Sequence, residues 1–160
     1  MTGPGGAARG RKAAGNAALQ GALAAENAAT FGYGVAGAYL IGRQRGTATA
    51  YWNEHRSARD TLAGLLRARG EQPTAADDVY KLPFGVHTAT EAVSLAIFLE
   101  NGVTAAYLGL VGAGNARLRA LGARAMQDAA IRATSWRGST VAFPGMPAAR
   151  RAPRRPADRT

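Results

Sequence analysis

Residues 88 to 111 read T-A-T-E-A-V-S-L-A-I-F-L-E-N-G-V-T-A-A-Y-L-G-L-V, and this stretch predicts a long, buried helix. Thr88 stands three residues before Glu91, which is the spacing of a capping box at a helix start. Steps of three and four residues place one stripe on a single helix face: Val93, Ile97, Glu100, Thr104, Tyr107 and Val111. Because the stripe is mostly apolar, we expect this helix to pack against others around a central carboxylate.

Three further stretches show the same spacing of apolar residues. We expect helices over about 16–43, 47–70 and 115–138, with Gly70 and Gly138 at the C-terminal ends, where a left-handed glycine is favoured. No stretch alternates between apolar and polar residues as a strand would. The chain of 160 residues is therefore predicted to be one all-α domain, a four-helix bundle over residues 16–147.

Residues 71–87, between the second and third predicted helices, are rich in Pro, Gly and Asp and read as a loop. At no more than about 3.3 Å per residue, this loop can follow a helix of about 35 Å from one end to the other. A long crossover between the two helices and a shorter excursion are both compatible with that length.

The net charge of +10 is concentrated near the ends of the chain. Arg9, Arg11 and Lys12 lie before residue 16, and five arginines lie within 148–160. Such compositions predict two disordered basic tails, 1–15 and 148–160. The tails either aid solubility or make weak, salt-sensitive contact with nucleic acid or with an anionic membrane.

Other features of composition restrict the class of protein. Cysteine is absent, which excludes disulfides, thiolate metal sites and a cysteine nucleophile. The preference for Arg over Lys, with abundant Ala and Gly, indicates a high-GC bacterial genome. The longest apolar run, residues 31–42, has 12 residues and is shorter than the roughly 20 that span a bilayer. Near the N-terminus, polar residues fall where a signal peptide would need its apolar segment. We therefore expect no membrane span and a cytoplasmic location.

Each predicted inner stripe carries one ionisable group: Glu26, His55, Glu100 and Asp128. Burial of four unpaired charges is costly, so these groups must meet partners. We expect the three carboxylates to share one layer and His55 to lie a turn or more nearer one end. Three carboxylates and an imidazole predict a site for iron, manganese or zinc.

A metal-free network is the alternative interpretation of the same residues. Arg132 follows Asp128 by one turn and would neutralise the carboxylates, while His55 would take a hydrogen bond. Tyr33 and Tyr107 lie on the same stripes and would supply hydroxyl groups. This inventory favours a non-enzymatic structural or interaction protein without a cofactor, and a homodimer formed through exposed apolar helix faces. The alternative function is a mononuclear metal-binding protein or oxidase.

Six segments in order resemble a ferritin-like family named domain of unknown function 4439. They cover about residues 17–147: L-A-A-E-N-A-A-T-F-G-Y-G-V-A-G at 23–37, H-R-S-A-R-D at 55–60, V-Y-K-L-P-F at 79–84, F-L-E-N-G at 98–102, D-A-A-I-R-A-T-S-W-R at 128–137 and A-F-P-G-M-P at 142–147. The resemblance implies a ferritin-like four-helix bundle with a long crossover between helices two and three.

The wider superfamily holds two metals with a Glu from each of two helices and a Glu-x-x-His from each of the others. By resemblance, Glu26 and Glu100 match the two single glutamates. His55 matches one motif histidine, but Trp52 replaces its glutamate. Asp128 matches the other motif glutamate, and its histidine would be Ile131. The resemblance therefore implies a degenerate di-metal site.

Overall fold

The computed structural model describes residues 4–113 and 115–138, and this part of the chain is all-helical. Its four helices are α1 (Pro4–Tyr39), α2 (Gly42–Ala68), α3 (Ala89–Val111) and α4 (Ala116–Arg137). No strand occurs among these residues, which confirms the predicted all-α class. The predicted tail at 148–160 lies outside the described residues.

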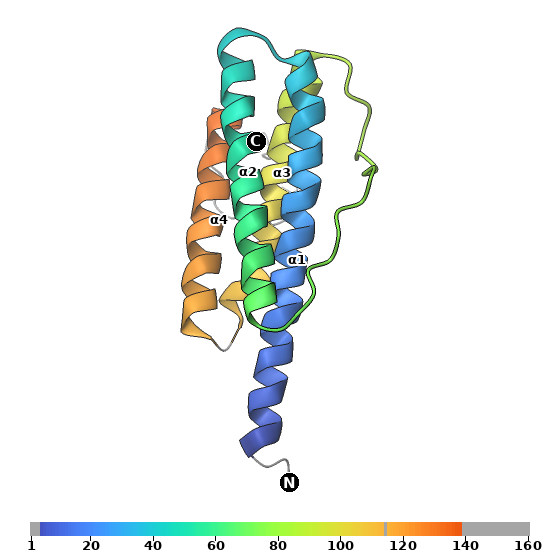
Figure 1. Cartoon of the computed structure of the whole chain (residues 1–160). Helices are drawn as coiled ribbons and strands as arrows, with labels where there is room; N and C mark the ends of the chain where they lie inside the picture. The colour runs from blue at the N-terminus through green and yellow to red at the C-terminus, as the bar shows by residue number, and fades with distance from the viewer. Residues whose placement is uncertain (1–3, 114, 139–160) are drawn as a thin grey trace, which may run out of the picture.

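The helices lie alongside one another, and α1 packs against both α2 and α3, while α3 also packs against α4 (Figure 1). The connection between α2 and α3 follows α1 from one end of the helices to the other (Figure 1). Gln20 of α1 bonds this connection twice, donating to the Gln72 carbonyl at 2.7 Å and accepting from the Thr74 amide at 2.9 Å. Consequently α2 and α3 run in the same direction.

The start of α3 and the C-terminal ends of α2 and α4 form where the sequence predicted them. The Thr88 hydroxyl accepts from the Glu91 amide, and the Glu91 carboxylate accepts from the Thr88 amide, so the predicted capping box is present. Gly70 and Gly138 have positive φ angles of 73° and 75°, as expected after a helix C-terminus. The turn between α1 and α2 uses a third such glycine, Gly42, at φ 52°.

The first helix differs most from expectation, because α1 begins at Pro4. Residues 4–15 are therefore helical, and the predicted disordered tail over 1–15 is wrong for them. Ala, Arg and Lys favour helix, and the Arg69 side chain fixes the start of the packed part of α1. It donates to the Asn16 side chain at 2.6 Å and to the Lys12 carbonyl at 3.2 Å.

The core consists of two apolar clusters separated along the helix axes. Leu19, Leu62 and Leu110 belong to one cluster, and Leu40 and Leu95 to the other. Close approach of the helices depends on two glycines: a Cβ on Gly32 would lie 2.6 Å from Leu99, and one on Gly122 would lie 2.9 Å from the Tyr107 carbonyl. Between the two clusters lie the buried ionisable residues.

Among the described helices, α3 is the one long and apolar enough to cross a membrane. Polar residues, among them Glu100 and Asn101, interrupt the apolar residues of this helix, so no long unbroken apolar run marks it in the sequence. Within the bundle, 44% of its most apolar window is buried, and the core helix of a soluble bundle passes the same test. Length and composition therefore do not distinguish a span from a core helix here.

Candidate functional site

A network of buried charges lies at the centre of the bundle, and each helix contributes one member. Glu26 comes from α1, His55 from α2, Glu100 from α3 and Arg132 from α4. None of the four residues is more than 9% exposed. Since apolar clusters lie on both sides along the axis, the four groups must satisfy one another.

His55 joins the two carboxylates. Its Nδ1 lies 2.7 Å from Glu26 Oε2, and its Nε2 lies 3.1 Å from Glu100 Oε1. A carboxylate accepts and does not donate, so both ring nitrogens must carry protons to make both bonds. Burial lowers the pKa of His55, but hydrogen bonds to Glu100 and Glu26 raise it further than that, to about 9. His55 is therefore an imidazolium at neutral pH.

Glu100 is the most heavily bonded member of the network. Its Oε1 accepts from the Tyr33 hydroxyl at 2.6 Å and from Arg132 Nε at 2.9 Å, in addition to His55. Burial raises the pKa of Glu100, but His55 and Arg132 together hold it below its usual value. The other oxygen, Oε2, is buried without a hydrogen-bond partner among the described residues.

Two tyrosines on the predicted inner stripes each donate a hydrogen bond to one of the carboxylates. Tyr107 donates to Glu26 Oε1 at 2.8 Å, and Tyr33 accepts from Trp136 Nε1 at 2.8 Å while it donates to Glu100. Burial and the neighbouring carboxylates raise the pKa of both phenols above its ordinary value. Both tyrosines therefore stay protonated and act as donors.

Arg132 connects the buried network to the surface. Its Nη1 donates to Glu54 Oε2 at 3.1 Å, and the Glu54 side chain is 55% exposed. Burial lowers the pKa of Arg132, but Glu100 and Glu54 raise it above its usual value. The predicted role of Arg132, the neutralisation of carboxylates, matches this geometry.

Two features of the predicted site are wrong. Asp128 is exposed and makes none of the network contacts described above, because the inner face of α4 is formed by Ala129, Arg132 and Ala133. It lies at the rim of a cavity instead. His55 is not displaced toward one end, since it bonds both Glu26 and Glu100 directly. The layer therefore contains an arginine where a third carboxylate was expected.

Sequence reasoning also missed two participants. Glu54 lies on the exposed side of α2, yet its carboxylate accepts a hydrogen bond from Arg132. Trp136 follows Arg132 by one turn on α4, so the same stripe of that helix could have indicated its contact with Tyr33. No comparable signal existed for Glu54, which lies beside His55 on the outer side of α2.

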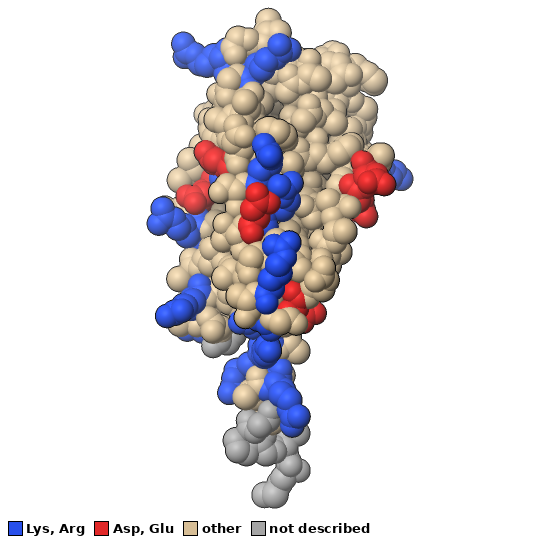
Figure 2. Space-filling view, viewed as in Figure 1, with Lys and Arg blue, Asp and Glu red and all other residues tan. Residues whose placement is uncertain are grey.

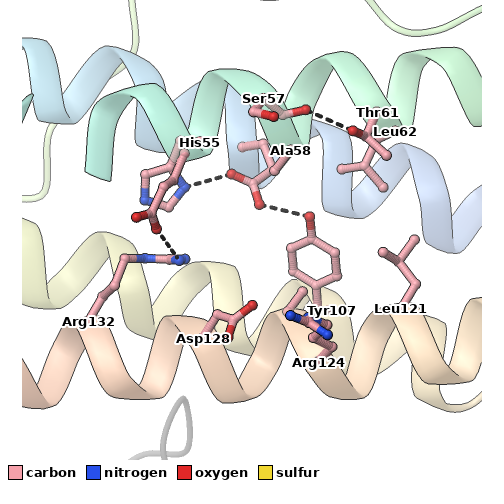
Figure 3. A pocket seen from close by; sticks show the side chains of 13 residues that line it. His55, Ser57, Ala58, Thr61, Leu62, Tyr107, Leu121, Arg124, Asp128 and Arg132 are labelled. Atoms are coloured by element: carbon pink, nitrogen blue, oxygen red, sulfur yellow. Dashed lines mark hydrogen bonds and ion pairs between the residues drawn. The ribbon is translucent and has the colours of Figure 1, made fainter. Parts of the chain in front are cut away.

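A cavity of about 480 Å³ opens between α2 and α4 and reaches the edge of the network. Figure 3 shows His55 and Ser57 on one wall, Arg124, Asp128 and Arg132 on the other, and the Tyr107 ring between the two walls. The cavity gives access to one side of Glu26 and His55, while Glu100 does not line it.

The donor atoms present do not fit a di-metal centre. Both nitrogens of His55 and both oxygens of Glu26 are already paired within the protein. Only one buried carboxylate oxygen among the described residues, Glu100 Oε2, lacks a partner, and iron, manganese or zinc requires several ligand atoms. Within residues 4–113 and 115–138, no three His, Cys, Asp or Glu side chains are grouped to hold a metal ion.

Comparison with known proteins agrees with the resemblance found in the sequence. The family described as domain of unknown function (DUF4439) matches residues 18–148. The crystal structure of a conserved hypothetical protein, rv2844, from Mycobacterium tuberculosis is similar with a TM-score of 0.76 and 34% identity. That similarity covers 79% of this chain and 96% of the other. The search of curated proteins gave no match.

Proposed function

The chain belongs to the family described as domain of unknown function DUF4439, and we propose that it is a ferritin-like bundle in which a buried ion network occupies the place of a metal centre. On this proposal it is a structural or interaction protein and not a metal oxidase. The long connection that joins two parallel helices, α2 and α3, supports the ferritin-like assignment, because such bundles contain one crossover of this kind.

One observation carries the proposal: His55 uses both ring nitrogens to bond two carboxylates. With Arg132 on Glu100, the four buried groups form two positive and two negative charges. A divalent cation placed among them would add charge to a set that is already balanced. It would also compete with the protons of His55 for Glu26 and Glu100.

A mononuclear metal site is the second candidate, and two observations favour it. Glu100 Oε2 is a buried carboxylate oxygen without a partner among the described residues. The cavity between α2 and α4 also gives a path to Glu26 and His55. In this alternative, Glu26, His55 and Glu100 would bind iron or manganese after His55 lost its protons and Arg132 moved away.

Metal analysis separates the two functions. Tag-free protein is stripped with a chelator, titrated with Fe²⁺, Mn²⁺ and Zn²⁺, and desalted, and bound metal is measured by mass spectrometry. We expect no stoichiometric metal, and we expect the nitrogen NMR signals of His55 to show a doubly protonated ring at pH 7. Stoichiometric metal that is lost in Glu26→Gln and Glu100→Gln but kept in Asp128→Asn would establish the mononuclear site instead.

A further inference from the structure

A second polar feature lies at the end of the bundle where α1 projects beyond the other helices (Figure 1). Figure 2 shows Lys and Arg side chains gathered on this projecting part of α1 and at the adjoining end of the bundle. Arg9, Arg11 and Lys12 lie on α1, and Arg69 follows the end of α2. This surface is separate from the buried ion network, and an inference about the surface does not depend on the function proposed for the network.

Two shallow hollows adjoin α1 at this end, with volumes of about 350 Å³ and 230 Å³. Lys12 and Arg69 line both of them, while Arg9 completes the first and Arg11 the second. Among the described residues that line the two hollows, Glu71 is the one that carries a carboxylate, and it lines the first hollow. Four cations around two adjacent hollows form a surface suited to two or more negative groups.

Arg69 fixes positive charge at the junction of the hollows. Its guanidinium donates to the Asn16 side-chain oxygen at 2.6 Å and to the Lys12 carbonyl at 3.2 Å. Both acceptors are neutral, so these bonds orient the side chain without cancelling its charge. The Asn16 amide nitrogen in turn donates to Glu71 at 2.9 Å, which holds that carboxylate in its own hydrogen bond.

We propose that this surface, formed by Arg9, Arg11, Lys12 and Arg69, binds the phosphate backbone of duplex nucleic acid without reading its sequence. Repeated phosphates on a backbone match cations spread over neighbouring hollows, and Arg and Lys supply most contacts of this type. Recognition would rest on charge, because the amide side chains that line the hollows, Asn16 and Asn115, are already hydrogen-bonded within the protein.

The composition of α1 favours a duplex over two other polyanions. Residues 4–15 contain no Leu, Ile, Phe or Trp, so this segment lacks the apolar face that anchors a helix in a membrane interface. Residues 4–30 contain no aromatic side chain, and unpaired bases are usually bound by stacking on such rings. A surface of cations without apolar or aromatic side chains suits a continuous phosphate backbone.

The test uses the full chain and a short fluorescein-labelled DNA duplex, with anisotropy measured over a series of salt concentrations. Arg11→Ala/Lys12→Ala removes two exposed cations, so the slope of log K against log salt should become shallower by about 2, with an affinity loss of roughly 10- to 100-fold at low salt. The matched control, Arg43→Ala/Arg56→Ala, removes the same charge from α2 away from this surface and should stay within about threefold of wild type because of screening.

Circular dichroism first confirms that both double variants are folded. Equal duplex binding by wild type and Arg11→Ala/Lys12→Ala would overturn the proposal. So would binding that disappears when residues 148–160 are deleted while the Arg11→Ala/Lys12→Ala variant still binds normally. Binding to vesicles that contain phosphatidylserine, without binding to the duplex, would assign the surface to membranes and would equally refute it.

Discussion

Replacement of His55 by glutamine should remove a pH dependence from the stability of the protein. Glutamine is similar in size and can donate to one carboxylate, but it carries no charge. Because His55 lies between Glu26 and Glu100 with 1% exposure, its imidazolium is stabilised in the folded state. The unfolded chain provides no such partners, so folding and protonation of His55 are linked.

The sign and the size follow from the pKa of His55, which rises from 6.5 in the unfolded chain to about 9 in the fold. The folded protein binds more protons than the unfolded chain between these two values, so the free energy of unfolding falls as pH rises. The contribution of the His55 imidazolium to the free energy of unfolding is complete below pH 6.5 and lost above pH 9. One pKa unit corresponds to about 1.36 kcal/mol, so the total is about 3 kcal/mol.

Urea unfolding at several pH values between 6 and 10 gives the free energies for wild type, His55→Gln and the control His87→Gln. The difference between wild type and His55→Gln should shrink by about 3 kcal/mol from the lowest to the highest pH. His87→Gln should follow wild type, because the His87 side chain is exposed. A difference that stays constant across this range would refute the proposed imidazolium.

Two further pairs of substitutions test the charge balance and the packing. Arg132→Met should lower the free energy of unfolding by about 3 to 5 kcal/mol, because Glu100 loses a buried partner. Adding Glu100→Gln restores neutrality and should recover part of that loss; a double variant less stable than Arg132→Met alone would contradict the charge argument. Gly122→Ala should lower the free energy of unfolding by about 1 to 3 kcal/mol, because the added methyl group would collide with Leu110. The control Gly21→Ala has open space around it and should be neutral or stabilising. Thermal unfolding of both variants measures the difference.

The sequence predicted most of the fold because local signals determine it. The capping box at Thr88 and the glycines at 70 and 138 define helix ends by hydrogen bonding and by backbone angle, and both are readable from residue type. The predicted start of α1 was wrong because the Gly and basic residues before residue 16 suggested disorder. The bonds from Arg69 to Asn16 and Lys12 join residues more than 50 positions apart, which no local pattern shows.

The members of the network were easier to predict than their geometry. Glu26, His55, Glu100 and Arg132 were each identified by their place on an inner stripe. Asp128 was placed inside because it shares a side of α4 with Arg132, but a rotation of about 40° separates residues four apart on a helix. That rotation decides which of the two is buried. It depends on packing against α3, where Gly122 permits close contact.

The distribution of the four buried charges has a consequence for folding. The α1–α2 hairpin contains Glu26 and His55, and the α3–α4 hairpin contains Glu100 and Arg132, so the two buried charges within each hairpin cancel before the hairpins dock. The connection over residues 69–88 is too long to dictate how they align. A slip of one turn, about 5.4 Å, would place charges against leucines at a cost of several kcal/mol per ion. We therefore expect misaligned docking of the two hairpins to be penalised, so that the buried charges favour the native alignment.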